Sequence, residues 1–210
     1  MLFSLTHKFL FIANLKTAST AIEVVLGPYA ELRLVRSEFG KHISYVKFLE
    51  HFDWLTRRID MNEVFVWGVI REPVDYVLSV FNAHTKERFR DQPKLYTGNL
   101  SFDDFLESWA PTHPDQLRPQ ISRFLRADGQ PGTNLLITLD TLQEGLQMVA
   151  DKIDIPALKS MPRDNESPAV LSRADLNAAQ LAWIEKRFRK DTEAIARWGN
   201  RLMSPGAMQA

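Results

Sequence analysis

The residues with the clearest chemical potential form a short polar loop near the N-terminus. Residues 14–20 (NLKTAST) join an apolar segment to the start of an expected helix and bring together one lysine and three hydroxyls. A helix N-terminus already favours an anion, because its first N–H groups lack partners and its dipole is positive there. The pattern predicts a phosphate-binding loop, and the alternative is a helix cap beside a solvated lysine. The candidate ligands are Lys16, Thr17, Ala18, Ser19 and Thr20.

A second candidate anion site follows another apolar segment, in residues 71–81 (REPVDYVLSVF). Arg71 ends the apolar segment, and Ser79 lies about two turns into the helix that Pro73 is expected to start. A guanidinium group can hold a phosphate through two parallel hydrogen bonds, and a hydroxyl can add a third donor. We therefore predict that Arg71 and Ser79 bind an anion. The alternative is an ordinary arginine at a strand end beside a routine proline helix start.

These loops need a scaffold that brings strand ends together. Continuous apolar segments without alternation are typical of strands buried on both faces, and helices between them indicate a parallel sheet covered by helices. The expected strands are residues 8–13, 64–70 and 134–139. The helices expected to follow them are residues 19–26, about 73–89 and 142–153, with further helical stretches at about 45–58, 102–109, 116–126 and 173–198. Because ligands bind at the carboxyl edge of such sheets, the two polar loops should lie at one edge.

Length, composition and charge limit the possible classes. The chain has 210 residues, of which 45% are hydrophobic, so we expect a single domain spanning residues 1–210. Lys plus Arg and Asp plus Glu number 26 each, which indicates neither a nucleic-acid partner nor a membrane surface. There is no cysteine, and the histidines lack metal-ligand spacing, so no metal site is predicted. No apolar run approaches the roughly 20 residues of a membrane span, which favours a cytoplasmic protein.

The first loop differs from a nucleoside-triphosphate loop, since it contains no glycine where G-x-x-x-x-G-K-[ST] needs two. It resembles instead the loop P-K-[ST]-[GA]-[ST]-[ST] of the sulfotransferases that use 3'-phosphoadenosine-5'-phosphosulfate (PAPS), with Leu15 in place of the usual proline. The second stretch is similar to the family's R-[ND]-P-x-x-R-x-x-S-x-[YF] signature. It departs from that signature at Glu72 and Tyr76, and the four residues that match are Arg71, Pro73, Ser79 and Phe81.

The resemblance implies an α/β fold of the P-loop-nucleotide-kinase-like sulfotransferase type, with a parallel central sheet flanked by helices. It implies that residues 16–20 hold the 5'-phosphosulfate of PAPS and that Arg71 and Ser79 hold its 3'-phosphate. The product would be adenosine 3',5'-bisphosphate. Residues 117–125 and 161–167 resemble the carbohydrate-type branch, as in a small bacterial-like member. That likeness implies nucleotide contacts from Arg163 and Ser167, and a plain polar loop is the alternative.

The acceptor of the sulfuryl group would be a hydroxyl of a small molecule or a glycan. His42, in the segment GKHIS, resembles a K-H segment of small carbohydrate-type members, and an imidazole titrates near neutral pH, as a general base should. The alternative bases are His51, Glu23 and Asp140. Lys16 would stabilise the charge that develops on the leaving phosphate. Two other functions remain open from the residues alone: a nucleotide or small-molecule kinase, and a nucleotide-binding module without turnover.

Overall fold

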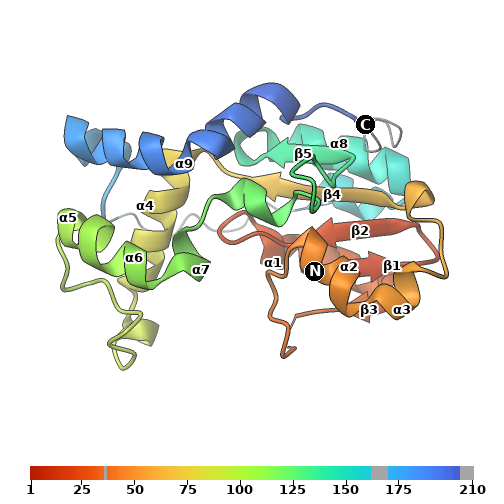
Figure 1. The fold of residues 1–210 in the computed structure, drawn as a ribbon, viewed down its shortest axis with the longest axis horizontal. Coiled ribbons are helices and arrows are strands. Elements are labelled where there is room, and N and C mark those ends of the chain that lie inside the picture. The colour runs from red at the N-terminus through yellow and green to blue at the C-terminus, as the bar shows by residue number, and fades with distance from the viewer. Residues whose placement is uncertain (36, 162–169, 204–210) are drawn as a thin grey trace.

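The computed structural model describes residues 1–35, 37–161 and 170–203, which form a five-stranded sheet flanked by helices (Figure 1). The strand order is β3-β1-β2-β4-β5. The strands are β1 (Leu2–Ser4), β2 (Phe9–Ile12), β3 (Leu32–Arg33), β4 (Phe65–Ile70) and β5 (Leu135–Thr138). The α-helices are α1 (Ser19–Leu26), α2 (Tyr45–His51), α3 (Asp53–Thr56), α4 (Pro73–His84), α5 (Phe102–Asp104), α6 (Ala110–Thr112), α7 (Pro114–Leu117), α8 (Leu142–Ile153) and α9 (Ala178–Trp198).

The three strands expected from the apolar segments are present, and they run parallel to one another. β2 pairs with β4, and β4 pairs with β5. The expectation of a wholly parallel sheet is wrong, because β1 is antiparallel to both β2 and β3. Only residues 5–8 separate β1 from β2, and a connection this short permits an antiparallel hairpin but no crossover. The fold is therefore α/β with a mixed sheet.

Both faces of the sheet are buried, which explains why its strands show no polar alternation. Side chains alternate between faces along a strand. Phe9 and Phe11 pack in a core with residues of α1 and α8. Leu10 and Ile12 pack on the opposite face with residues of α2 and of the C-terminal part of α9.

A third apolar cluster builds a separate helical part beside the sheet. It joins α4, residues 102–110 and the first half of α9, with Phe105 and Phe188 fully buried in it. Figure 1 shows this part next to the carboxyl ends of the parallel strands, with α9 running along both parts. The dihedral angles of α9 depart from helical values at Phe188 (φ −106°, ψ 17°), between the turns that contact the two cores.

Several expected helices are shorter or broken. α1 and α8 have the expected bounds, but α4 ends at His84, and residues 87–89 form a separate 3-10 turn. The expected helix at 116–126 is wrong, because the ψ angles of Arg118 (157°) and Pro119 (125°) are not helical and a 3-10 turn over Gln120–Arg123 follows. Residues 105–109 form a π-helical turn. No helix within the described parts of the chain is long and apolar enough to cross a membrane.

Phe124 packs so closely against β4 that no side chain fits at Gly68. A Cβ built at Gly68 would lie 2.3 Å from Phe124 Cε1 and 3.0 Å from the carbonyl oxygen of Ile12. Gly68→Ala should therefore lower the free energy of unfolding by about 1–3 kcal/mol through overpacking. Chemical denaturation followed by circular dichroism measures this loss.

Gly98→Ala is the matched control for this prediction. A Cβ at Gly98 would also meet an aromatic side chain, that of Tyr96, but Tyr96 is only half-buried and can rotate away. The control should lose less than about 0.5 kcal/mol, as is usual for surface substitutions. Equal stability of the Gly68 variant and the wild type would contradict the packing described for β4.

Candidate functional site

The loop between β2 and α1 has an unusual backbone. Lys16 and Ala18 both adopt left-handed dihedral angles, with φ 61° and 56°. Such conformations are uncommon for residues other than glycine and cost about 1–3 kcal/mol each. Ala18 is the N-cap of α1 and has no side chain that could accept from the first N–H groups of the helix. Those N–H groups are the ones that lack intrahelical partners, so the turn leads into a helix start suited to an anion.

The hydroxyl groups of this loop do not all point the same way. Thr17 is fully buried, and its hydroxyl donates to the carbonyl oxygen of Asn14 at 3.1 Å, which closes the loop on itself. Thr20 is exposed, and its Oγ1 accepts from Lys41 Nζ at 2.9 Å. Ser19 is buried at the first position of α1. Thr17 can therefore offer a ligand its backbone N–H, since its hydroxyl proton is used inside the loop.

The two predicted anion sites lie side by side. Arg71 follows the last residue of β4, and its Nη1 donates to the carbonyl oxygen of Lys16 at 3.4 Å. β2 and β4 are neighbouring parallel strands, so their carboxyl ends open at the same edge of the sheet. Ser79 lies half-buried on α4, which begins two residues after Arg71. The structure thus joins the polar loops that the sequence placed at two separate strand ends.

Lys16 lies in a strongly positive environment. Burial and, after it, the charges of Lys86, Arg71 and Arg88 together lower the pKa of its ammonium group to about 8. Lys86 and Arg88 belong to the segment after α4, which sequence reasoning did not assign to the site. The basic run T-K-E-R-F-R after the second motif was the available signal. A bound anion would relieve the mutual repulsion of these cations.

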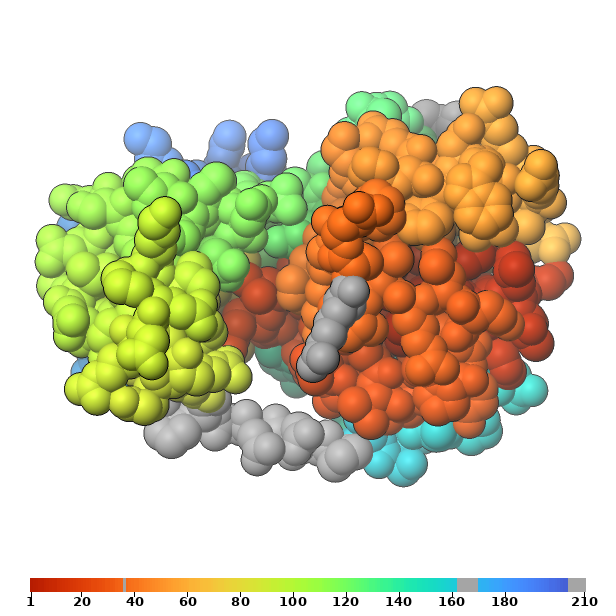
Figure 2. Space-filling view, turned by 90° about the horizontal axis from the view of Figure 1, so that it is seen from below, coloured from red at the N-terminus to blue at the C-terminus, as the bar shows by residue number. Residues whose placement is uncertain are grey.

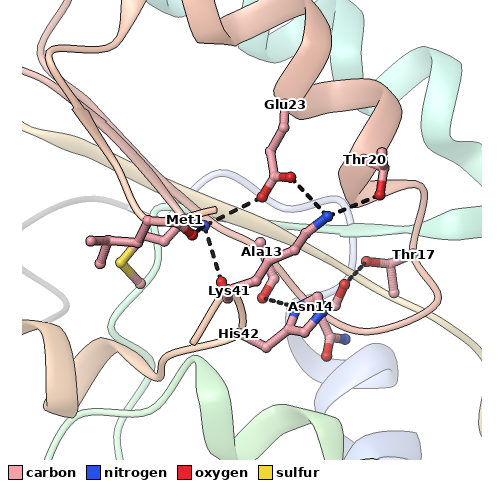
Figure 3. Close-up of polar contacts among 9 residues, drawn as sticks. Met1, Ala13, Asn14, Thr17, Thr20, Glu23, Lys41 and His42 are labelled. Carbon is pink, nitrogen blue, oxygen red and sulfur yellow. Dashed lines mark hydrogen bonds and ion pairs between the residues drawn. The ribbon is translucent and has the colours of Figure 1, made fainter. Parts of the chain in front are cut away.

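His42 contacts the same strand end from the other side. Its Nδ1 lies 3.1 Å from the carbonyl oxygen of Ala13, the residue after β2 (Figure 3). A carbonyl oxygen only accepts, so Nδ1 carries the proton, and in the neutral ring Nε2 is left as a base. Burial, followed by the charges of Arg123 and Lys41, lowers the pKa of His42 to about 4 against the raising effect of the Ala13 contact, so this imidazole does not titrate near neutral pH as expected from the sequence. The ring is therefore neutral at pH 7.

Lys41, next to His42, connects the loop to a buried carboxylate. Its Nζ lies 2.8 Å from Glu23 Oε2 and also donates to Thr20, as Figure 3 shows. The amino group of Met1 approaches the other oxygen of Glu23 at 3.4 Å. Burial lowers the pKa of the Met1 amino group to about 6, so at pH 7 Glu23, an alternative candidate base, contacts one ammonium group and one largely neutral amino group. Lys41 is a residue that sequence reasoning missed, although its position beside His42 was visible.

A hollow lies between the two parts of the chain that border the candidate site. Figure 2 shows it between the yellow-green and green segment that follows α4 and the orange segment that leads from α1 into α2, with red N-terminal residues at its floor. Arg123, only 2% exposed, joins the walls by donating from Nη1 to the carbonyl oxygen of His42 and from Nη2 to that of Asp115. His42 also lines a concavity of about 490 Å³. Its other lining residues are Glu38, Phe39, Ile43, Ser44, Lys47, His51 and Arg118.

The remaining candidates are less closely placed. His51 is exposed, and its ring lies 4.7 Å from that of Phe39. Asp140 is exposed in a 3-10 turn after β5. Arg163 and Ser167 lie outside the described residues.

Comparisons with protein-family models, with curated proteins and with solved structures each returned no match. The functional assignment therefore depends on the residues and on their arrangement.

The environment of His42 predicts a pH dependence of stability. The unfolded chain takes up a proton near pH 6.5, whereas the native state resists protonation until about pH 4. Burial of the neutral His42 ring therefore costs no stability above pH 6.5, but the free energy of unfolding decreases as the pH falls from 6.5 towards 4. His42→Gln should reduce this loss by about 1–3 kcal/mol, measured as the unfolding free energy at pH 7 and pH 4.5.

His51→Gln provides the control, since it removes an exposed histidine from the same concavity. This variant should retain the wild-type difference between the two pH values. Comparing variants cancels the contributions of other titrating groups. If His42→Gln and the wild type lose stability in parallel, the imidazole is not held neutral by burial.

Proposed function

We propose that this protein is a sulfotransferase that moves the sulfuryl group of PAPS to a hydroxyl acceptor. The observation that carries the proposal is the meeting of Lys16 and Arg71, each from the loop after one of two adjacent parallel strands. Each loop matches one donor-binding signature of that family at these residues. A chance likeness in sequence would not require the two loops to lie in contact.

The arrangement suits a ligand with two separate anionic groups. The left-handed loop and the start of α1 form the proposed site for the 5'-phosphosulfate, with Lys16 as its cation. Arg71 and Ser79, from the β4 end and α4, form the proposed site for the 3'-phosphate. The nearby charges of Lys86 and Arg88 add to the same positive field.

The proposed reaction needs positioning and charge stabilisation more than covalent help from the protein. The acceptor oxygen attacks sulfur, the bond between sulfur and the bridging phosphate oxygen breaks, and adenosine 3',5'-bisphosphate leaves. The Lys16 ammonium stabilises the negative charge that develops on that oxygen. His42 Nε2 takes the proton of the acceptor hydroxyl, which a ring held neutral through Nδ1 is prepared to do.

The concavity that His42 lines is the proposed place of the acceptor. It adjoins the phosphate-binding loop through the contact of His42 with Ala13, and it presents both an aromatic ring, that of Phe39, and polar side chains. Such a mixture suits a polyhydroxylated molecule, and a sugar hydroxyl is one candidate. We expect a cytoplasmic, single-domain enzyme that requires no metal.

The first test measures nucleotide affinity by calorimetry. The bisphosphate should bind at least about tenfold more tightly than adenosine 5'-phosphate, because each charge-assisted hydrogen bond to the 3'-phosphate contributes roughly 1.5–3 kcal/mol. Arg71→Ala should reduce this difference in affinity between the two nucleotides. Arg189→Ala removes the same charge from an exposed site on α9 and should leave the difference unchanged. Equal affinities for the two nucleotides in the wild type would rule out the proposed 3'-phosphate site.

The second test measures turnover. Lys16→Ala should abolish sulfuryl transfer from labelled PAPS across a panel of hydroxyl acceptors, read by mass spectrometry, while its melting temperature stays near that of the wild type. The loss follows because the leaving phosphate would no longer have its cation.

Lys8→Ala is the matched control for turnover. Lys8 also has a positive φ, 48°, and it forms an exposed ion pair with Glu63, so the substitution reproduces both the backbone setting and the charge change. This variant should retain full activity. Near-normal transfer by the Lys16 variant would show that the donor binds elsewhere.

A further inference from the structure

Gln120 lies at the centre of a buried polar cluster that joins the two site loops to α9. It is fully buried, as are Asn14 and Asp191. It follows Arg118 and Pro119, whose non-helical ψ angles interrupt the continuous helix expected from the sequence. The break in that helix turns the Gln120 side chain towards the strand ends, where it makes the contacts described next.

The carboxamide of Gln120 binds the backbone of Arg71 at two points. Its Oε1 accepts from the N–H of Arg71 at 3.0 Å, and its Nε2 donates to the carbonyl oxygen of Arg71 at 2.7 Å. The N–H can only donate and the carbonyl can only accept, so this pair fixes the orientation of the amide. The side chain thereby continues the hydrogen-bond pattern of the sheet one residue beyond β4.

The same carboxamide also reaches the start of the phosphate-binding loop. Oε1 of Gln120 accepts from Asn14 Nδ2 at 3.1 Å, and Asn14 Nδ2 donates to the carbonyl oxygen of Val69 at 3.2 Å. Asn14 Oδ1 in turn accepts from the N–H of Leu15, immediately before Lys16. A single amide oxygen is therefore shared by the two segments that carry Lys16 and Arg71.

Asp191 anchors this arrangement from α9, three residues after the irregular turn at Phe188. Its Oδ2 accepts from the backbone N–H of Gln120 at 2.8 Å and from Nε2 at 3.3 Å, while Oδ1 accepts from the N–H of Ile121 at 2.9 Å. Three donors converge on two acceptor atoms, and an asparagine would turn an N–H₂ group towards one of them. The three donors therefore require a carboxylate at this position.

We propose that Gln120 and Asp191 are positioning residues that hold the Lys16 loop and Arg71 at a fixed separation. Neither side chain is exposed to a ligand, so their effect is transmitted through the backbone of Arg71 and through Asn14. Loss of the Gln120 amide would remove two hydrogen bonds from the half-buried backbone groups of Arg71, and the loop would move to replace them. The proposal concerns geometry alone, and only its ligand readout rests on the proposed function.

The test compares Gln120→Leu with the wild type by amide hydrogen exchange and by calorimetry with adenosine 3',5'-bisphosphate. Gln120→Leu should reduce the protection of the Arg71 amide by at least about tenfold while the amides of β4 and β5 retain theirs. Bisphosphate affinity should fall by about tenfold or more. Asp191→Asn should produce the same local pattern and provides the test if the leucine variant does not fold.

Gln180→Leu is the matched control. Gln180 is also a buried glutamine bonded to a carboxylate, that of Asp103 at 2.8 Å, but it lies at the start of α9. This variant should lose stability without changing the protection of Arg71 or the affinity. Unchanged protection of Arg71 in a folded Gln120 variant would overturn the inference, as would a loss spread evenly over Arg71, β4 and β5.

The two readouts separate this inference from the proposed function. If the wild type does not bind the bisphosphate, the proposed donor is wrong, and the exchange pattern still decides whether Gln120 positions Arg71. If the wild type binds and the folded Gln120 variant binds equally well with the same exchange pattern, the donor site stands and the positioning role is wrong.

Discussion

The carboxyl ends of β2 and β4 are buried beyond the point at which the hydrogen-bond ladder of the sheet stops. Backbone N–H and C=O groups in such a place need other partners, because leaving one unpaired costs about 1–3 kcal/mol. Asn14 and Gln120 supply these partners through their amide side chains. The same bonds draw the two loops together, so the separation of Lys16 and Arg71 follows from a requirement of the sheet. The proposed donor site depends on this constraint.

Unfavourable features are concentrated where these loops meet. Lys16 and Ala18 have left-handed backbones, and Lys16 is partly buried among other cations, which lowers its pKa to about 8. Stability alone would favour glycines and fewer charges at such a position. Backbone strain and charge repulsion in one loop are typical of a site that binds a ligand of opposite charge, since the ligand offsets part of the cost. This is an independent physical reason to expect an anion there.

The part of the candidate site that contains His42 and Arg123 comes from residues outside the strands. The helical part beside the sheet has its own apolar cluster, and α9 packs on both. Arg123 crosses between the walls of the hollow and holds the backbone of His42, whose ring is fixed by the end of β2. The proposed base is thus positioned by the same strand, β2, that leads into the proposed phosphate-binding loop.

Sequence patterns alone predicted the parallel strands, the bounds of α1 and α8, and the two polar loops at strand ends, because each of these leaves a local signal of apolar pattern or motif. Two strands were missed, β1 and β3, which are too short to leave a pattern, and a helix was wrongly expected through residues 116–126. The folded structure was needed to show that Gln120 contacts Arg71 and Asn14 and that Asp191 anchors Gln120. It was also needed to show that Lys41 contacts the loop and that Arg123 holds His42. These partners are far apart along the chain. Local periodicity reports which face of an element is buried, but the pairing of distant polar groups is set by the packing of whole elements.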